Sequence, residues 1–176
     1  MKKLVTLLLL LLMVTPGVAQ VKKAKEKPVK ARTEKQTKTY FDAKVVGVKD
    51  GDTYVVLTEK KEQFVIRLAA VDCPEKKQNF GQKAKEFSSD QIFGKLVKVR
   101  IISKDKYGRN IAYIVYDKKD LSKELLKAGL AWHYKEYDKS NYLQSLENTA
   151  RKNKVGLWIE DNPIRPSDFR NLKTKK

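Results

Sequence analysis

From residue 41 onward, apolar and polar positions alternate with the two-residue period of β-strands. The pattern predicts three strands at the start of this region, at 43–48, 54–57 and 64–69. The third is the clearest, since Phe64, Ile66 and Leu68 fall on one face. A Gly-Asp turn joins the first two strands and a polar turn at 59–62 joins the next two, so we expect an antiparallel meander.

A helical period replaces the alternation after the meander. A helix is predicted at 81–93, because its small and apolar residues share one side and Gly94 follows as a stop signal. Two further strands follow, at 96–102 and 110–116. A Tyr-Gly turn separates them, so they should form a hairpin.

Two more helices complete the pattern. The first is short and begins at a cap formed by Asp120 or Ser122. The second runs from about 140 to 154, with its leucines on one face. Trp158 and Ile159 come after it and are expected to pack back onto the domain.

This order of elements, three strands, a helix, two strands and two helices, defines the expected fold class. It is α+β and mainly β. Five short strands with one inserted helix fit a five-stranded Greek-key barrel of the oligonucleotide-binding (OB) type, here with three α-helices. About 130 residues are sufficient for one hydrophobic core.

The N-terminus has the features of a secretory signal peptide. Lys2 and Lys3 precede an apolar run at 4–14, and small residues at 17–19 offer a cleavage site. The run is shorter than the roughly 20 apolar residues of a membrane span. We therefore expect an exported protein, secreted or periplasmic, with no membrane span in the mature chain. The alternative is that the run remains as an uncleaved anchor.

The formal net charge is +18, and most of it lies near the two ends of the chain. Basic segments of this kind are usually solvated and attract polyanions in a salt-dependent way. One alternative is therefore a surface protein that adheres through its basic ends. We expect four regions: a signal peptide at 1–19, a basic linker at 20–38, one domain at 39–162 and a basic tail at 163–176.

Cys73 is the single cysteine and His133 the single histidine. One cysteine cannot form an internal disulfide, so an exported chain of this sequence depends on its core for stability. A nucleophilic Cys73 would need His133 to lie beside it in the fold, although 60 positions separate the two in the sequence.

Three short segments combine acids with arginines. They are Asp-Gly-Asp-Thr at 50–53, the stretch from Arg67 to Asp-Cys-Pro-Glu at 72–75, and Asp-Lys-Tyr-Gly-Arg at 105–109. Each has a structural explanation alone, as a hairpin turn, an ion pair or a strand end. Acids beside phosphate-binding arginines would repel a nucleic acid, unless a metal ion lies between carboxylate and phosphate. Together the segments indicate phosphate chemistry.

In these segments, and in Gly-Leu-Ala at 129–131 and Gly-Leu-Trp at 156–158, the chain resembles the staphylococcal nuclease (thermonuclease) family over about 38–161. The resemblance implies calcium-dependent (Ca2+) hydrolysis of DNA and RNA by a monomer without a stable protein partner. The products would carry 3′-phosphates. The alternative from another class is an OB-type module that binds nucleic acid without cutting it.

The resemblance also implies roles for nine residues. Asp52 and Asp72 would bind calcium, with the backbone carbonyl of Cys73 as a further ligand. Arg67 and Arg109 would hold the phosphate, and Glu75 would activate or position the attacking water. The residues expected at the bound nucleotide are Lys106, Tyr107 and Tyr137, with Tyr134 as a second candidate for the stacking position of Tyr137.

Two features depart from the family's pattern. Cys73 stands where the type enzyme has threonine, which should matter little if only the backbone carbonyl is used. The segment between Glu75 and Gly81 is shorter than the flexible loop that is usual there. The shorter segment is expected to affect substrate affinity and the mobility of Glu75. Trp132 and Trp158 are expected in the core.

Overall fold

The computed structural model describes residues 39–174, and of the side chains in the last helix it describes those up to residue 172. The expected signal peptide and linker lie outside the described residues. None of the helices that the structure describes is long and apolar enough to cross a membrane.

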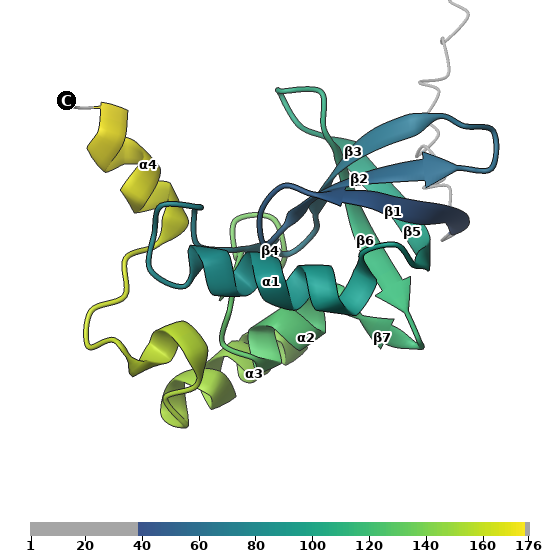
Figure 1. Ribbon diagram of the computed structural model, residues 1–176. Helices are drawn as coiled ribbons and strands as arrows, with labels where there is room; N and C mark the ends of the chain where they lie inside the picture. Colours follow the sequence, from purple (N-terminus) through teal and green to yellow (C-terminus); the bar gives the residue numbers. More distant parts are fainter. Residues whose placement is uncertain (1–38, 175–176) are drawn as a thin grey trace, which may run out of the picture. The chain divides into compact units, whose positions relative to one another are not determined.

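Five strands form a closed barrel (Figure 1). The hydrogen-bonded order is β3-β2-β1-β5-β6, and a parallel pairing between β3 and β6 closes the ring. A two-residue strand, β7 (Lys119–Asp120), pairs antiparallel with the end of β6. The barrel strands are β1 (Phe41–Val48), β2 (Thr53–Thr58), β3 (Gln63–Leu68), β5 (Leu96–Lys104) and β6 (Asn110–Tyr116).

The alternation of the sequence decides which side chains fill the barrel. In β6 every second residue from Asn110 to Tyr116 is buried, and the residues between them are half-buried. Register shifts in β1 between Val45 and Gly47, and in β5 between Ile101 and Ser103, mark irregularities of the bulge type. Such irregularities bend strands, and a closed barrel requires strongly curved strands.

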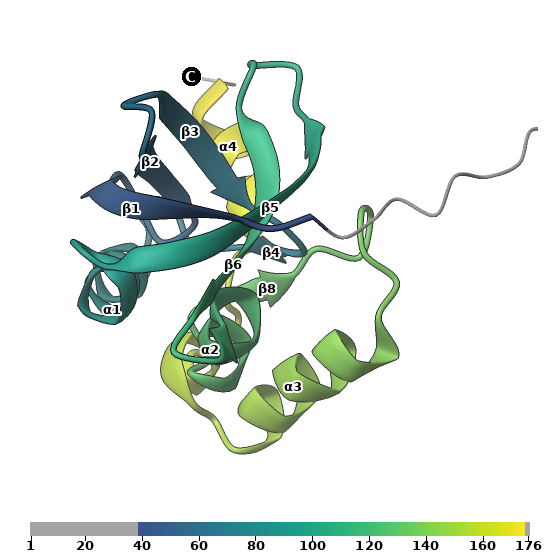
Figure 2. The same cartoon turned by 90° about the vertical axis from the view of Figure 1, so that its right-hand side faces the viewer.

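Three helices lie together on one side of the barrel in the view of Figure 1, and Figure 2 shows them again below it. They are α1 (Gly81–Ile92), α2 (Leu121–Lys127) and α3 (Asn141–Lys152). Asp120 caps α2 by accepting from the backbone N–H of Ser122 at 3.0 Å. The hydroxyl of Ser140 accepts from the N–H of Leu143 at 3.3 Å and caps α3. The expected barrel and its three helices are thereby confirmed.

The structure also corrects the predicted elements. A fourth α-helix, α4 (Pro166–Thr174), follows the three that were expected. Its first turn suits proline, which lacks the N–H that would be left unpaired there, but this part of the chain was expected to be a basic tail. Residues 156–159 form a 3₁₀-helix, η1 (Gly156–Ile159), and two-residue strands pair as β4 (Val71–Asp72) and β8 (Trp132–His133).

A small second core joins η1 to α3. Trp132 and Trp158 are both buried, as expected, and their rings meet edge to face with centroids 4.5 Å apart. The guanidinium of Arg151 lies over the Trp158 ring, 3.8 Å from its centroid. Ile159 does not pack back as predicted but is exposed, since the turn of η1 places Trp158 inward and its successor outward.

Candidate active site

Two pairings bring the first two acid–arginine segments together. Thr53 of β2 stands opposite Arg67 of β3, so Asp52 lies beside the end of β3. The backbone N–H of Leu68 donates to the carbonyl of Asp52 at 2.8 Å and fixes this position. The chain then turns directly from β3 into β4, which contains Asp72.

The guanidinium of Arg67 bridges two carboxylates. Its Nη1 donates to Oδ1 of Asp52 and its Nη2 donates to Oδ1 of Asp72. Both aspartates are buried, whereas the Arg67 side chain remains 14% exposed. Burial alone would lower the pKa of Arg67, but the two carboxylates raise it above its usual value. The arginine therefore stays charged and holds the two acids side by side.

Asp52 is held on its other side as well. Its Oδ2 accepts a hydrogen bond of 2.7 Å from the backbone N–H of Cys73. Burial raises the pKa of Asp52 to about 7, while Arg67 opposes the rise and the charges of Asp50 and Asp72 add to it. The attraction of Arg67 thus does not outweigh the effect of burial on Asp52.

Cys73 is buried and does not meet His133. Burial raises the pKa of its thiol well above the usual value, which disfavours the thiolate form. The ring nitrogens of His133 contact Oδ1 of Asp138 and Oε1 of Gln144, each at 3.0 Å. The alternative of a Cys–His nucleophile therefore has no geometric basis.

Glu75 lies at the surface of the site, with its side chain 35% exposed. Its backbone N–H donates to Oε1 of Gln78 at 3.0 Å. The short segment after Glu75 folds back tightly, since a Cβ added at Gly81 would come within 2.0 Å of the Glu75 carbonyl oxygen. The shortened loop is thus a compact turn that requires glycine where it meets α1.

Arg170 of α4 also belongs to this cluster, although the sequence did not suggest it. Its Nη1 donates to Oε1 of Glu75 at 2.6 Å, and its Nη2 donates to Oδ2 of Asp72 at 3.2 Å. Nothing in the basic C-terminal sequence separates Arg170 from its lysine and arginine neighbours. The contact depends on the tertiary path of the chain, which brings α4 to Asp72 and Glu75.

Arg109 precedes β6 and has its own acidic partner. Its Nε donates to Oδ2 of Asp105 at 2.7 Å, and this pairing helps to lower the pKa of Asp105 although burial alone would raise it. In the parallel register Ile111 stands opposite Arg67. This pairing places the start of β6, and Arg109 just before it, beside the strand that contains Arg67.

The residues expected at the nucleotide lie in two exposed segments. Lys106 and Tyr107 are in the turn between β5 and β6, and Tyr107 is exposed. Tyr137 is also exposed, and its ring lies 4.8 Å from that of Tyr134. Burial first, and then the charge of Asp72, raise the pKa of Tyr134. Tyr134 is thus close enough to Asp72 to be affected by its charge. Tyr137 packs beside Tyr134.

The described residues contain no group of three or more His, Cys, Asp or Glu side chains that could hold a metal ion. The site instead offers two carboxylates that share one guanidinium. Any divalent cation bound here would need backbone carbonyl or water oxygens to complete its shell, a mixture that calcium accepts.

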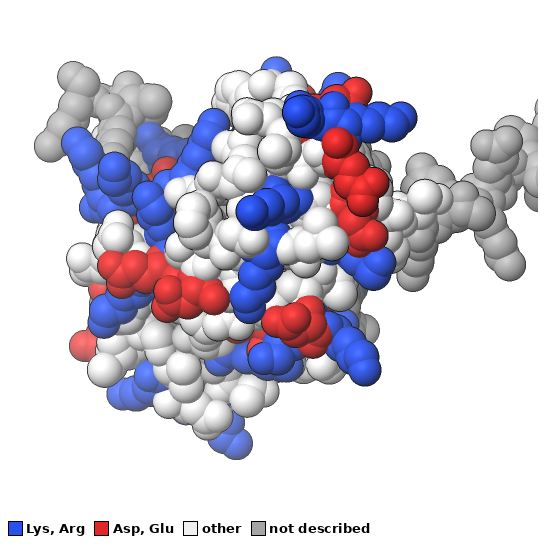
Figure 3. Space-filling view, turned by 45° about the vertical axis from the view of Figure 1, so that its right-hand side comes forward, with Lys and Arg blue, Asp and Glu red and all other residues white. Residues whose placement is uncertain are grey.

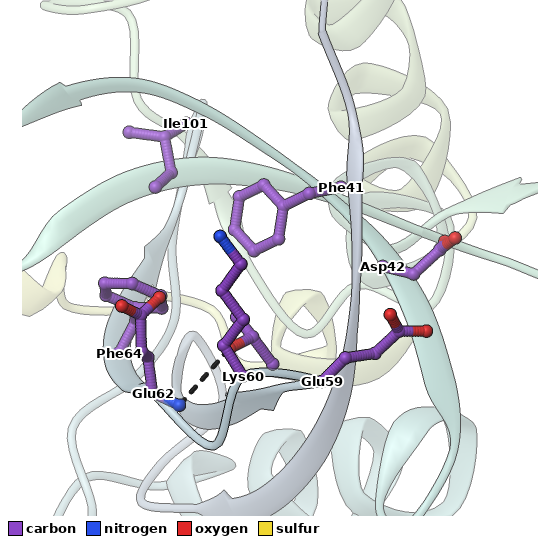
Figure 4. Close-up of a pocket in the computed structure, with 8 residues that line it drawn as sticks. Phe41, Asp42, Glu59, Lys60, Glu62, Phe64 and Ile101 are labelled. Carbon is purple, nitrogen blue, oxygen red and sulfur yellow. Dashed lines mark hydrogen bonds between the residues drawn. The ribbon is translucent and has the colours of Figure 1, made fainter.

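Among the described residues, one cavity lies away from the site and another lies next to it. One of about 440 Å3 is lined by Phe41, Phe64 and Ile101, with Lys60 beside them (Figure 4). It is at the end of the β2–β3 hairpin opposite Asp52 and contains none of the expected site residues. A second, of about 390 Å3, lies beside the site and is lined in part by Pro74, Trp132 and Phe169.

Charge on one face of the molecule is mixed. In the view of Figure 3, basic and acidic side chains are interspersed and do not form one continuous basic field. This agrees with the sequence, in which most of the net positive charge lies near the chain's ends. The mixed acid–arginine cluster is therefore the feature that distinguishes the domain.

Comparison with known proteins assigns the chain to a family. A model described as staphylococcal nuclease homologue matches residues 65–160, more than half of the 176 residues. The chain belongs to the staphylococcal nuclease family. The matched region contains Arg67, Asp72, Glu75 and Arg109, and Asp52, which lies before it, is joined to it by the ion pair with Arg67.

Three relatives illustrate the similarity. An uncharacterized endonuclease of Haemophilus influenzae is 43% identical over 128 residues, which cover 72% of this chain and 71% of the relative. An uncharacterized endonuclease of Escherichia coli O157:H7 is 36% identical over 131 residues, covering 74% and 85%. The staphylococcal-like nuclease CAN1 of Arabidopsis thaliana is 40% identical over 112 residues, covering 64% of this chain and 35% of the relative.

Proposed function

We propose that this protein is a calcium-dependent nuclease that hydrolyses phosphodiester bonds of DNA and RNA. The observation that supports the proposal most strongly is the bridge of Arg67 between the buried carboxylates of Asp52 and Asp72, with Glu75 close by. Family membership and the printed names of the relatives agree with nuclease activity.

The chemistry of the acids fits calcium. Asp52 and Asp72 supply hard carboxylate oxygens, the donor type that calcium prefers. Burial raises the pKa of Asp52 and so disfavours its charged form, and a bound cation would favour that form. When bound, calcium would stabilise negative charge on the phosphate oxygens. Asp52, Asp72 and the Cys73 carbonyl are the groups that we propose to hold it.

Arg67 and Arg109 are proposed to bind the phosphate. A guanidinium has five N–H groups in a planar fork, and the contacts of Arg67 with the two aspartates use two of them. Arg109 lies just before β6, the strand that pairs with the strand of Arg67, and would have to leave Asp105 to bind the same phosphate. Two guanidinium groups would neutralise charge that develops on the phosphate during cleavage.

Glu75 is the proposed partner of the attacking water. It is the exposed acid of the cluster, and its carboxylate lies at the same guanidinium as Asp72. Glu75 would accept a proton from the water or orient it, as the water oxygen bonds to phosphorus. The bond to the 5′-oxygen breaks, that oxygen takes up a proton, and the other product keeps a 3′-phosphate. The exposed Tyr107, with Lys106, and the Tyr134–Tyr137 pair would contact the nucleotide.

The rival proposal is a module that binds nucleic acid without cutting it. In that case Asp52, Asp72 and Glu75 would have no use, because each repels a polyanion. Three acids are nevertheless gathered on two arginines. The cluster therefore favours hydrolysis over binding alone.

Export belongs to the same proposal. The segment 1–19 would direct the chain out of the cytoplasm, and the basic segments 20–38 and 163–176 would raise its affinity for polyanions at low salt. A calcium-dependent enzyme suits an exterior location. The chain could be stable there without an internal disulfide, because the barrel supplies a hydrophobic core.

A cleavage assay tests the proposed function. The purified protein is incubated with DNA or RNA and calcium, and a parallel sample receives excess chelator. We expect cleavage that the chelator stops and calcium restores, with a phosphate at the 3′ end of each product. Undiminished cleavage in chelator would refute the calcium requirement, and binding without any cleavage would favour the rival proposal.

A further inference from the structure

Arg170 places a positive charge where the proposed reaction needs free acids. Its two terminal nitrogens reach Asp72 and Glu75 at once, at 3.2 and 2.6 Å. Asp72 already accepts from Arg67 through Oδ1, so Arg170 takes its remaining oxygen. Asp72 is one of the two carboxylates proposed to bind the cation. Both of its oxygens therefore already accept a hydrogen bond from a guanidinium group.

The rest of the C-terminal segment is attached to the same loop. The amide nitrogen of Gln78 donates to the carbonyl of Ile164 at 2.6 Å, while its oxygen accepts from the N–H of Glu75. Asn79 donates to Oε1 of Glu160 at 2.8 Å. The side chain of Gln78 thus links the backbone of Glu75 to the segment just before α4. This link helps to hold Arg170 near Asp72 and Glu75.

A guanidinium and a divalent cation compete for the same carboxylate oxygens. Each is attracted by Asp72, and each repels the other when both are close. Glu75 is affected as well, because the oxygen that accepts from Arg170 is not free to accept a hydrogen bond from the attacking water. The contacts of Arg170 therefore oppose both groups that the proposed reaction uses.

We propose that Arg170 is an intramolecular latch, which closes on Asp72 and Glu75 in the resting protein and withdraws when a cation and substrate bind. The latch rests on the proposed function, because it acts on the groups assigned there. It can open because the side chain of Arg170 is 43% exposed, and ion pairs at such positions are weak and screened by salt.

The test compares Arg170→Gln with Arg165→Gln. Arg165 is a matched control, since it precedes α4, is 44% exposed, and contacts Glu136 and the Trp132 ring but not the site. Calcium binding to each purified protein is measured by titration calorimetry without nucleic acid. Arg170→Gln should bind calcium roughly three- to tenfold more tightly than wild type, and Arg165→Gln should match wild type. Thermal unfolding in chelator confirms that each variant folds.

A second measurement follows the latch directly. Hydrogen exchange of the α4 amides in the wild-type protein should become faster when calcium is added, because the helix loses its contact with the acids. The same change should be much smaller in Arg170→Gln. Exchange that is unaffected by calcium in the wild type would overturn the latch.

The possible outcomes distinguish a failure of the latch proposal from a failure of the proposed nuclease function. Equal calcium affinity in wild type and Arg170→Gln, with cleavage intact, overturns only the latch. Loss of cleavage in Arg170→Gln at unchanged calcium affinity also overturns it and makes Arg170 a phosphate-binding residue. Absence of calcium binding in both proteins overturns the proposed function and the latch together.

Discussion

The backbone N–H of Cys73 donates a hydrogen bond of 2.7 Å to Oδ2 of Asp52, across 21 positions of sequence. This bond fixes the carboxylate just before β2 against the chain that leaves β4. It leaves Oδ1 of Asp52 to Arg67. The position of the acid is thus set by backbone as well as by charge, and it depends on close packing between the two segments.

Gly51→Ala should destabilise the protein. A Cβ at Gly51 would come within 2.8 Å of the Cβ atoms of Cys73 and Ala84, so one of the two packed segments must move. Overpacking of this kind typically costs about 1–3 kcal/mol, which urea unfolding measures. Gly47→Ala is the control, because a Cβ there meets only Val55, at 3.4 Å. Equal losses in the two variants would contradict the prediction.

The free energy of unfolding of the calcium-free protein should depend on pH through the titration of Asp52. Burial raises the pKa of this carboxyl from 3.8 to about 7 in the folded state, so the folded protein keeps a proton that the unfolded chain releases between these values. Stability falls with pH wherever the folded state binds more protons. The contribution is complete below about pH 4 and lost above about pH 7.

Asp52→Asn should therefore flatten the dependence of the free energy of unfolding on pH between about 4 and 7. The measurement is urea unfolding at a series of pH values in the presence of a chelator. Asp42→Asn is the matched control, since Asp42 is paired with Lys98 at the surface and its loss should leave the slope in place. A slope that survives Asp52→Asn would assign the pH dependence to another group.

Glu75→Gln should lower cleavage by roughly 10²–10⁴-fold, the usual contribution of a general base. The amide keeps the size of the side chain but is a far weaker proton acceptor. The folding midpoint should change little, because Glu75 is 35% exposed. Glu86→Gln on the exposed face of α1 serves as the control. A wild-type rate in Glu75→Gln would remove Glu75 from the mechanism.

Arg109→Ala should lower cleavage by roughly 10²–10³-fold, as expected when one group that stabilises developing charge is removed. Arg109→Lys should recover part of the loss, since it keeps the charge but lacks the planar fork. Lys104→Ala removes an exposed charge from the same hairpin and should change only the salt dependence of binding. If Lys104→Ala and Arg109→Ala behave alike, Arg109 contributes only general attraction.

The local pattern was sufficient for most elements of the fold. The alternation in 64–69 anticipated β3, and Asp120 and Ser140 cap helices as side chains of their type do. The pattern could not anticipate β4 and β8, because two-residue strands have no period. It also missed α4, because the lysines and arginines of this segment are typical of a solvated tail, whereas Arg170 joins the helix to acids far away in the sequence.

The sequence by itself determined the barrel and the kinds of group at the site, because side-chain period, turn residues and the order of acids and arginines are local properties. It could not decide which groups touch. The tertiary structure decided that Arg67 joins Asp52 to Asp72, that Arg109 stays with Asp105, and that Arg170 returns from α4 to the acids. These contacts depend on strand register and on the path of the C-terminus, which only the closed barrel and its packing fix.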